Sequence, residues 1–118
     1  MDDKTQKLKE KLERLLRDTA EAAAELQAAE RGAGKPVHFS QIEAAAHRVG
    51  SQLSCRIQER TARELAADMP QEAPCPTCEA LCRLKIERRT VRSTDGPLDL
   101  WELHAHCTRC RRDFFPSA

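Results

Sequence analysis

Residues 4–31 carry the polar and apolar pattern of one long helix. This stretch contains no proline or glycine, and charged residues fill most positions between a seam that recurs at alternating spacings of four and three: Leu8, Leu12, Leu15, Thr19, Ala22, Leu26 and Ala29. Such heptad spacing predicts a helix over about 4–31 that buries its seam. Because the second half of the seam offers alanine and threonine instead of leucine, the pattern favours packing on a neighbouring helix of the same chain. A coiled-coil homodimer through residues 8–29 is the alternative.

A second helix is predicted over about 40–68. Gly32, Gly34 and Pro36 end the first helix, since glycine accepts the left-handed cap conformation and proline cannot continue the hydrogen-bond ladder. Ser40 and Glu43 have capping-box spacing, with Phe39 placed as a hydrophobic staple. An apolar stripe then runs as far as Met69-Pro70, through Ile42, Ala46, Val49, Leu53, Ile57 and Leu65. The short connection predicts an antiparallel helical hairpin as the first domain, residues 1–69.

The remainder of the chain has the pattern of a β-hairpin. Residues 70–74 are expected to be a linker, because Pro70, Pro74 and Pro76 surround a stretch without periodicity. Extended segments follow around Leu84 and over residues 98–107, with turn residues at 94–97 between them. The predicted fold class is therefore a small α+β chain, in which a long helical hairpin precedes a zinc ribbon at 75–118.

Two cysteine pairs enclose this hairpin. Cys75 and Cys78, and then Cys107 and Cys110, are each three residues apart, and 28 residues separate the two pairs. An antiparallel hairpin of that length returns the second pair to the first, so the spacing predicts one tetrahedral ion bound by four thiolates. We expect a single structural Zn²⁺. Iron also suits four thiolates, and spacing does not separate the two metals.

The other cysteines and the histidines are not expected to bind the ion. Cys82 should lie in the core, on one strand face with Leu84 and Ile86, opposite Trp101, Leu103, Ala105 and Cys107 of the returning strand. Cys55 is interpreted as a partly exposed free thiol. His104 and His106 alternate onto the face opposite Cys107 and are expected to face solvent.

Composition and charge narrow the function classes. The formal net charge is +1, so the charge balance alone gives no reason to propose a nucleic-acid partner. The N-terminus lacks the apolar core of a signal peptide, and no apolar run is long enough to span a bilayer. We therefore expect a cytoplasmic protein without a membrane partner, in which paired cysteines hold metal instead of forming disulfides.

A local basic cluster nevertheless surrounds the cysteines. Its members, which could contact DNA phosphates or base edges, are Arg83, Lys85, Arg88, Arg89, Arg92, Arg109, Arg111 and Arg112. Seven acidic residues share the same region, so pairing of these arginines with Asp95, Asp99, Glu102 and Asp113 on a solvated strand is the equal alternative.

Several segments resemble a known family. They are Cys75-Pro76-Thr77-Cys78, Glu87-Arg88-Arg89-Thr90-Val91, Asp95-Gly96-Pro97 and Cys107-Thr108-Arg109-Cys110-Arg111-Arg112-Asp113-Phe114-Phe115-Pro116, preceded by His38-Phe39-Ser40-Gln41-Ile42-Glu43 and Ala46-His47. Together these segments are similar to the N-terminal region of bacterial insertion-sequence transposases of the ISKra type. The resemblance implies a helical and zinc-binding portion that contacts transposon-end duplex DNA, ahead of a ribonuclease-H-like catalytic domain.

The chain stops at Ala118, which leaves no room for that catalytic domain, so we expect it not to be an enzyme. No nucleophile paired with a base and no phosphate-cradling glycine loop is visible, and no small-molecule substrate is expected. The favoured hypothesis is a non-catalytic zinc-binding DNA-recognition module. The alternative is a zinc-stabilised protein-interaction or dimerisation module that does not bind nucleic acid.

Overall fold

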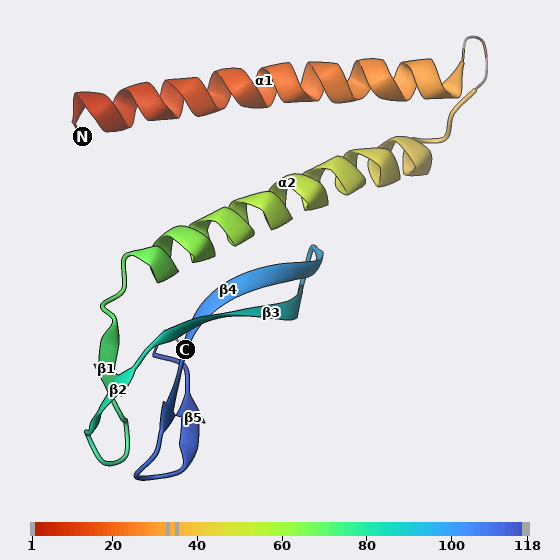
Figure 1. Cartoon of the computed structure of the whole chain (residues 1–118). Coiled ribbons are helices and arrows are strands. Elements are labelled where there is room, and N and C mark those ends of the chain that lie inside the picture. The colour runs from red at the N-terminus through yellow and green to blue at the C-terminus, as the bar shows by residue number, and fades with distance from the viewer. Residues whose placement is uncertain (1, 33, 35, 117–118) are drawn as a thin grey trace. The chain divides into compact units, whose positions relative to one another are not determined.

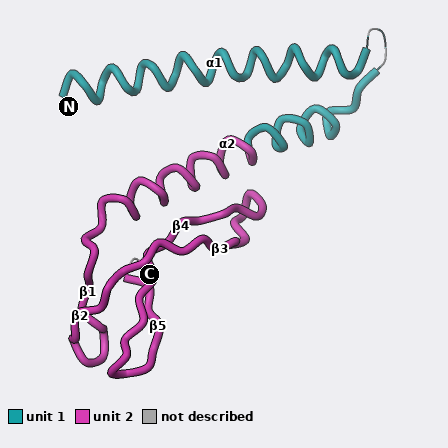
Figure 2. Tube along the Cα trace, in the orientation of Figure 1, with its two compact units in different colours: residues 1–50 teal, residues 51–118 magenta. Residues whose placement is uncertain are grey.

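The computed structural model describes residues 2–32, 34 and 36–116, and it confirms the predicted α+β class (Figure 1). Two long helices, α1 (Asp3–Arg31) and α2 (Phe39–Ala67), precede five strands. The strands are β1 (Glu72–Pro74), β2 (Leu81–Arg83), β3 (Lys85–Ser93), β4 (Gly96–Cys107) and β5 (Arg112–Phe114). The chain divides into two compact units, residues 1–50 and 51–118, and the division falls inside α2 (Figure 2).

Local hydrogen bonds define both ends of α1. At its start the backbone N–H of Thr5 donates to the Asp2 carboxylate at 2.6 Å, which satisfies one of the free amides of the first turn. At its end Gly32 takes a positive φ of 79° and donates its N–H to the Ala28 carbonyl. The predicted glycine stop is thus confirmed at Gly32, while Ala33 and Lys35 of the same turn lie outside the described residues. None of the described side chains of α1 is buried, so packing of its seam is not observed.

Helix α2 begins earlier than its capping pattern predicted. The Gln41 side-chain oxygen accepts the backbone N–H of His38 at 3.2 Å, and the His38 carbonyl accepts the first helical amides. His38 therefore precedes the first turn, and Ser40 lies within the helix. Phe39 is 72% exposed, so the expected hydrophobic staple is absent. Of the described residues, neither helix offers an apolar stretch long enough to cross a bilayer.

The expected linker at 70–74 is partly a strand. Residues 72–74 form β1, which pairs antiparallel with β2 and places Ala73 opposite Cys82. The Leu84 N–H extends this pairing by donating to the Gln71 carbonyl at 2.8 Å. A proline at the end of a short edge strand is compatible with such pairing, so the proline-rich composition did not exclude it.

Strand β4 is the centre of the second sheet, whose order is β3-β4-β5. Strands β3 and β4 form the predicted hairpin, with Ser93 opposite Gly96 at the turn and Lys85 opposite His104 at the far end. Gly96 has a φ of 119°, a conformation that side-chain-bearing residues rarely adopt. Strand β5 then pairs with the end of β4, where Cys107 lies opposite Arg112.

A small core lies between β2, β4 and the two cysteine pairs. Its buried residues are Cys75, Cys82, Leu84, Leu103, Ala105 and Cys107. Ala66 near the end of α2 and Met69 just beyond it pack against them. Cys82 is therefore a core residue, as predicted. Ile86 is not, because it is 59% exposed. The strand is interrupted at Leu84, so the alternation that begins at Cys82 does not continue into β3.

The position of the core predicts that truncating Leu103 lowers stability more than truncating Ile86. Leu103 is 6% exposed, so Leu103→Ala should lower the free energy of unfolding of the metal-loaded protein by about 2–5 kcal/mol. The matched control Ile86→Ala should cost less than about 1 kcal/mol, since this side chain already lies largely in solvent. Chemical denaturation followed by circular dichroism checks both, and equal losses would contradict the described core.

Candidate metal centre

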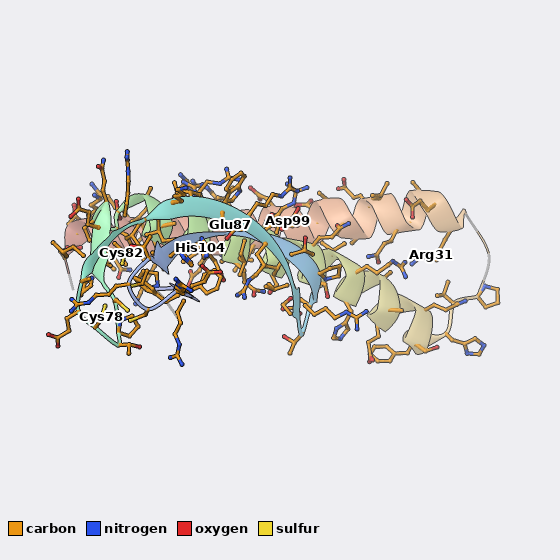
Figure 3. The ribbon with its side chains drawn as sticks, turned by 60° about the horizontal axis from the view of Figure 1, so that its bottom comes forward. Arg31, Cys78, Cys82, Glu87, Asp99 and His104 are labelled. Atoms are coloured by element: carbon orange, nitrogen blue, oxygen red, sulfur yellow. The ribbon has the colours of Figure 1, made fainter. Side chains whose placement is uncertain are left out.

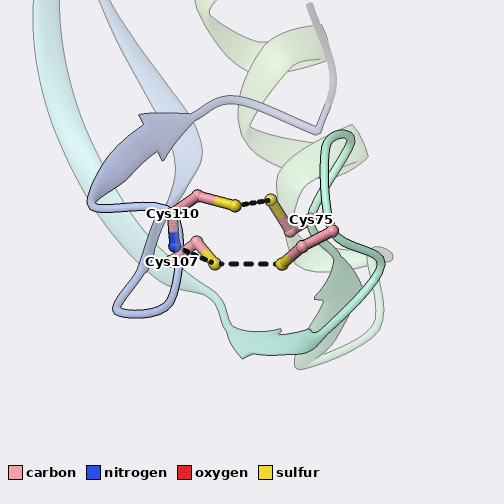
Figure 4. A group of neighbouring side chains, drawn as sticks. Cys75, Cys107 and Cys110 are labelled. Carbon is pink, nitrogen blue, oxygen red and sulfur yellow. Dashed lines mark hydrogen bonds between the residues drawn. The ribbon is translucent and has the colours of Figure 1, made fainter.

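Four cysteines from two distant turns converge at one point. Cys75 and Cys78 lie in the turn that joins β1 to β2, Cys107 ends β4, and Cys110 lies in the turn before β5. The β3–β4 hairpin supplies the return path, as the spacing predicted. Figure 4 shows Cys75 facing Cys110 across the site, with Cys107 beside them.

The sulfur positions fit a tetrahedral ion. All four Sγ atoms lie within 4.8 Å of one another. The Cys75–Cys110 separation is 3.9 Å and the Cys78–Cys107 separation is 3.5 Å. A zinc ion with Zn–S bonds of about 2.3 Å requires sulfurs about 3.8 Å apart, whereas a disulfide requires about 2.05 Å. The four cysteines could therefore hold a metal ion, and their separations do not correspond to disulfides.

The two turns share one local design. The Thr77 N–H donates to the Cys75 sulfur, and the Cys110 N–H donates to the Cys107 sulfur, each at 3.4 Å. The residue after each pair, Glu79 or Arg111, has a positive φ, of 63° and 55° respectively. This left-handed step reverses the chain after the second cysteine of each pair, and the amides directed at sulfur favour the thiolate form.

Hydrogen bonding gives the thiols of Cys107 and Cys110 different pKa values. The backbone N–H of Cys110 is the main reason that the pKa of Cys107 falls to about 6. The neighbouring Cys78 sulfur is the largest of the influences that raise the pKa of Cys110 to about 12. With this pKa, the Cys107 thiol is largely ionised at neutral pH and could meet a cation as the thiolate.

The other two cysteines are not among the four converging sulfurs, although Cys82 neighbours Cys107. Burial is the first cause that raises the pKa of Cys82, whose thiol donates to the Ala80 carbonyl at 3.4 Å. A neutral thiol held in this way is a core group and not a ligand. Cys55 is half-buried on α2, and its thiol lies 3.6 Å from the Asp95 carbonyl.

A groove of about 440 Å³ adjoins the metal-binding cysteines. Among the side chains that line it are Arg83 and Lys85, Arg109 from the second cysteine turn, and His104 and His106 of β4. We call this surface the basic groove. None of its three cationic side chains makes an ion pair with any residue in the described ranges.

Two other arginines of the predicted cluster are neutralised. Arg88 pairs with Asp99, which also accepts the Thr90 hydroxyl, and Arg89 pairs with Glu102 at 2.8 Å. Figure 3 locates Glu87, Asp99 and His104 along the β3–β4 ribbon. Arg92, Arg111 and Arg112, like the groove cations, have no ion-pair partner in the part of the chain that the structure describes. The predicted eight residues therefore divide into two that are paired and six that are available.

Strand alternation predicts that both histidines face solvent, and the structure corrects this for His104. Its side chain is 22% exposed, lies 3.5 Å from a Glu87 carboxylate oxygen and packs against the Phe115 ring in a tilted arrangement. His106 is exposed and pairs with Asp113 at 2.6 Å, and this hydrogen bond is the main reason that the Asp113 pKa is lowered. The Phe115 ring, which also packs beneath the Arg89 guanidinium, covers part of the His104 side chain. Strand alternation could not reveal this cover.

The geometry predicts which cysteines bind metal. Replacing any of Cys75, Cys78, Cys107 or Cys110 by serine should abolish the visible absorption of a tetrathiolate cobalt complex, because each supplies one of four ligands. Cys55→Ala and Cys82→Ala should retain one ion per chain. Cobalt titration and elemental analysis measure both quantities, and loss of the cobalt spectrum in the Cys55→Ala protein would contradict the assignment.

The pKa of Cys107 predicts how metal binding depends on pH. Bound ligands are thiolates, so protons compete with the ion and affinity falls as pH falls. Near pH 7.5 the Cys107 thiol, whose pKa is about 6, is already ionised, so binding should release fewer protons there than it does below pH 6. Calorimetry in buffers of different ionisation enthalpy counts these protons, and a count that does not change with pH would refute the unequal acidity.

Comparisons with protein-family models, with curated proteins and with solved structures each found no match. The role of the centre must therefore follow from its own chemistry. Four cysteine sulfurs at tetrahedral separations, within a small core, form a candidate metal centre, and among the described residues no side chain of another type joins them.

Proposed function

We propose that the chain is a non-catalytic module in which one structural zinc ion orders the strands and the basic groove beside it contacts nucleic-acid phosphates. The convergence of four sulfurs within 4.8 Å supports the proposed zinc site. A complete set of four protein ligands is typical of structural zinc, whereas catalytic zinc retains an open position for water or substrate.

Zinc explains why so small a core can be ordered. Only seven hydrophobic residues are buried in the described chain, and two of them are the metal-binding Cys75 and Cys107. Structural zinc in small peptides contributes about 10–16 kcal/mol of apparent binding free energy near neutral pH. The bound ion would supply a cross-link between the two cysteine turns that apolar burial on this scale cannot replace.

The charges around the centre favour an anionic partner. Four thiolates and one Zn²⁺ carry a formal charge of −2, which by itself repels phosphate. Within the described part of the chain, three cations without ion-pair partners line the adjoining groove and exceed that charge, and Arg92, Arg111 and Arg112 add further cations of this kind. Because Arg88 and Arg89 are already neutralised by carboxylates, we assign phosphate contact to the unpaired set.

The resemblance to insertion-sequence transposases supports duplex DNA as this partner. It also suggests that the DNA is the end of a mobile element. It rests on the cysteine spacing and on the arginine-rich segments beside it. A relationship to that family and a non-catalytic role are both parts of the proposal. An interaction module without nucleic-acid binding is the competing function, for which the near-neutral net charge is the supporting observation.

Binding to duplex DNA over a salt series tests this function. The zinc-loaded protein should bind at low salt, and Arg83→Ala, Lys85→Ala and Arg109→Ala should each weaken binding and reduce the salt slope by about one per lost phosphate contact. Arg88→Ala is the matched control, since Asp99 already neutralises that guanidinium, and it should leave the slope nearly unchanged. Fluorescence anisotropy measures both, and failure of the metal-loaded protein to bind at low salt would exclude the DNA half of the proposal.

A further inference from the structure

Helix α1 has a strongly uneven charge distribution. Residues 3–17 contain six basic and three acidic side chains, a net charge of +3. Residues 18–31 contain four acidic and one basic side chain, a net charge of −3. The helix is therefore a rod with a positive first half and a negative second half, and the sign changes between Arg17 and Asp18.

This distribution does not stabilise the helix itself. The macrodipole favours acidic groups at the N-terminal end and basic groups at the C-terminal end, which is the reverse of the overall arrangement in α1. Within its described residues the only ion pair is Lys7–Asp3, at 3.2 Å and largely exposed. Such pairs contribute only a few tenths of a kcal/mol. The charge separation therefore needs a partner outside the helix to be favourable.

The apolar seam of α1 is divided at the same place. Leu8, Leu12 and Leu15 lie in the positive half and are 46–56% exposed, whereas the negative half offers Thr19, Ala22 and Ala29 together with Leu26. Large seam residues thus lie in the positive half of the helix, and mostly small ones lie in the negative half. A helix of this kind is self-complementary only when a second copy runs in the opposite direction.

We propose that α1 is a homodimerisation surface on which a second copy of the chain binds antiparallel, centred near residue 17. In this arrangement Leu12 lies opposite Ala22 of the second copy, Leu15 opposite Thr19, and Leu8 opposite Leu26. Facing large residues with small ones keeps the two helix axes at an even separation along most of the seam. A parallel pair would place leucine on leucine in one half, alanine on alanine in the other, and like charges together throughout.

Charge complementarity selects the same orientation. Lys11 flanks the seam in the positive half and Glu25 flanks it in the negative half, so the antiparallel pair brings Lys11 of one copy near Glu25 of the other, twice. Within one helix these residues are about 21 Å apart along the axis, too far for contact. The surface goes beyond the proposed function, because it involves neither the metal centre nor the basic groove.

A zero-length carbodiimide cross-link between lysine and carboxylate tests the orientation on the unmodified full-length protein. The dimer fraction should contain a Lys11–Glu25 link, which the length of the helix forbids within one chain, and mixing isotopically labelled and unlabelled chains should show that it joins two copies. Links confined to α1 and α2 of one chain would show instead that α1 packs on its own neighbour, and would overturn the proposal.

Paired charge reversals test the physical cause. Lys11→Glu and Glu25→Lys should each weaken the dimer several-fold at low salt, and the double variant should restore it, because opposite charges again face each other. Leu12→Glu should abolish dimerisation, whereas Ala24→Glu, outside the seam and exposed, should not. Sedimentation equilibrium up to about 1 mM measures these shifts. A monomer at every concentration, or a double variant no better than the singles, would refute antiparallel pairing.

Discussion

The approach of four sulfur atoms to within 4.8 Å is the constraint on which residues 51–118 depend. Thiolates brought this close repel one another, so the arrangement is favourable only with protons or a cation between the sulfurs. Backbone amides donate to the Cys75 and Cys107 sulfurs, which favours their thiolate forms, and the chain turns back after each pair through a left-handed residue. The hairpin between the pairs is held in register at one end by these turns and at the other by Gly96.

The surface near this centre separates neutralised from available charge. Arg88 and Arg89 are held by carboxylates of the partner strand, and Arg89 also covers the Phe115 ring. Such pairs are partly exposed and contribute little stability, but they fix the charge pattern of the hairpin. Among the described residues, Arg83, Lys85, Arg109, Arg111 and Arg112 lie near the cysteine turns without ion-pair partners and would offset the negative charge of a thiolate-bound ion.

In residues 1–50, helix α1 is stabilised by local interactions and not by a buried core. Helix α1 is defined by its own caps and backbone hydrogen bonds, and it buries no described side chain. An isolated helix in water gains little from propensity alone, so most helices depend on packing for their stability. The antiparallel self-pairing that we propose would account for both the exposed leucines and the divided charge of α1.

Spacing along the chain is enough to determine a large part of this protein. The cysteine pairs, the two helices, the hairpin between Ser93 and Gly96 and the core position of Cys82 follow from periodicity, from turn residues and from the reach of a folded-back strand, all of which act over short stretches of chain. Tertiary structure decided the rest. Pairing with β2 converted residues 72–74 into a strand, the break at Leu84 exposed Ile86, and the Phe115 ring covered His104. Each of these depends on which segments meet across the fold, and a pattern read along one segment contains no information about its neighbour.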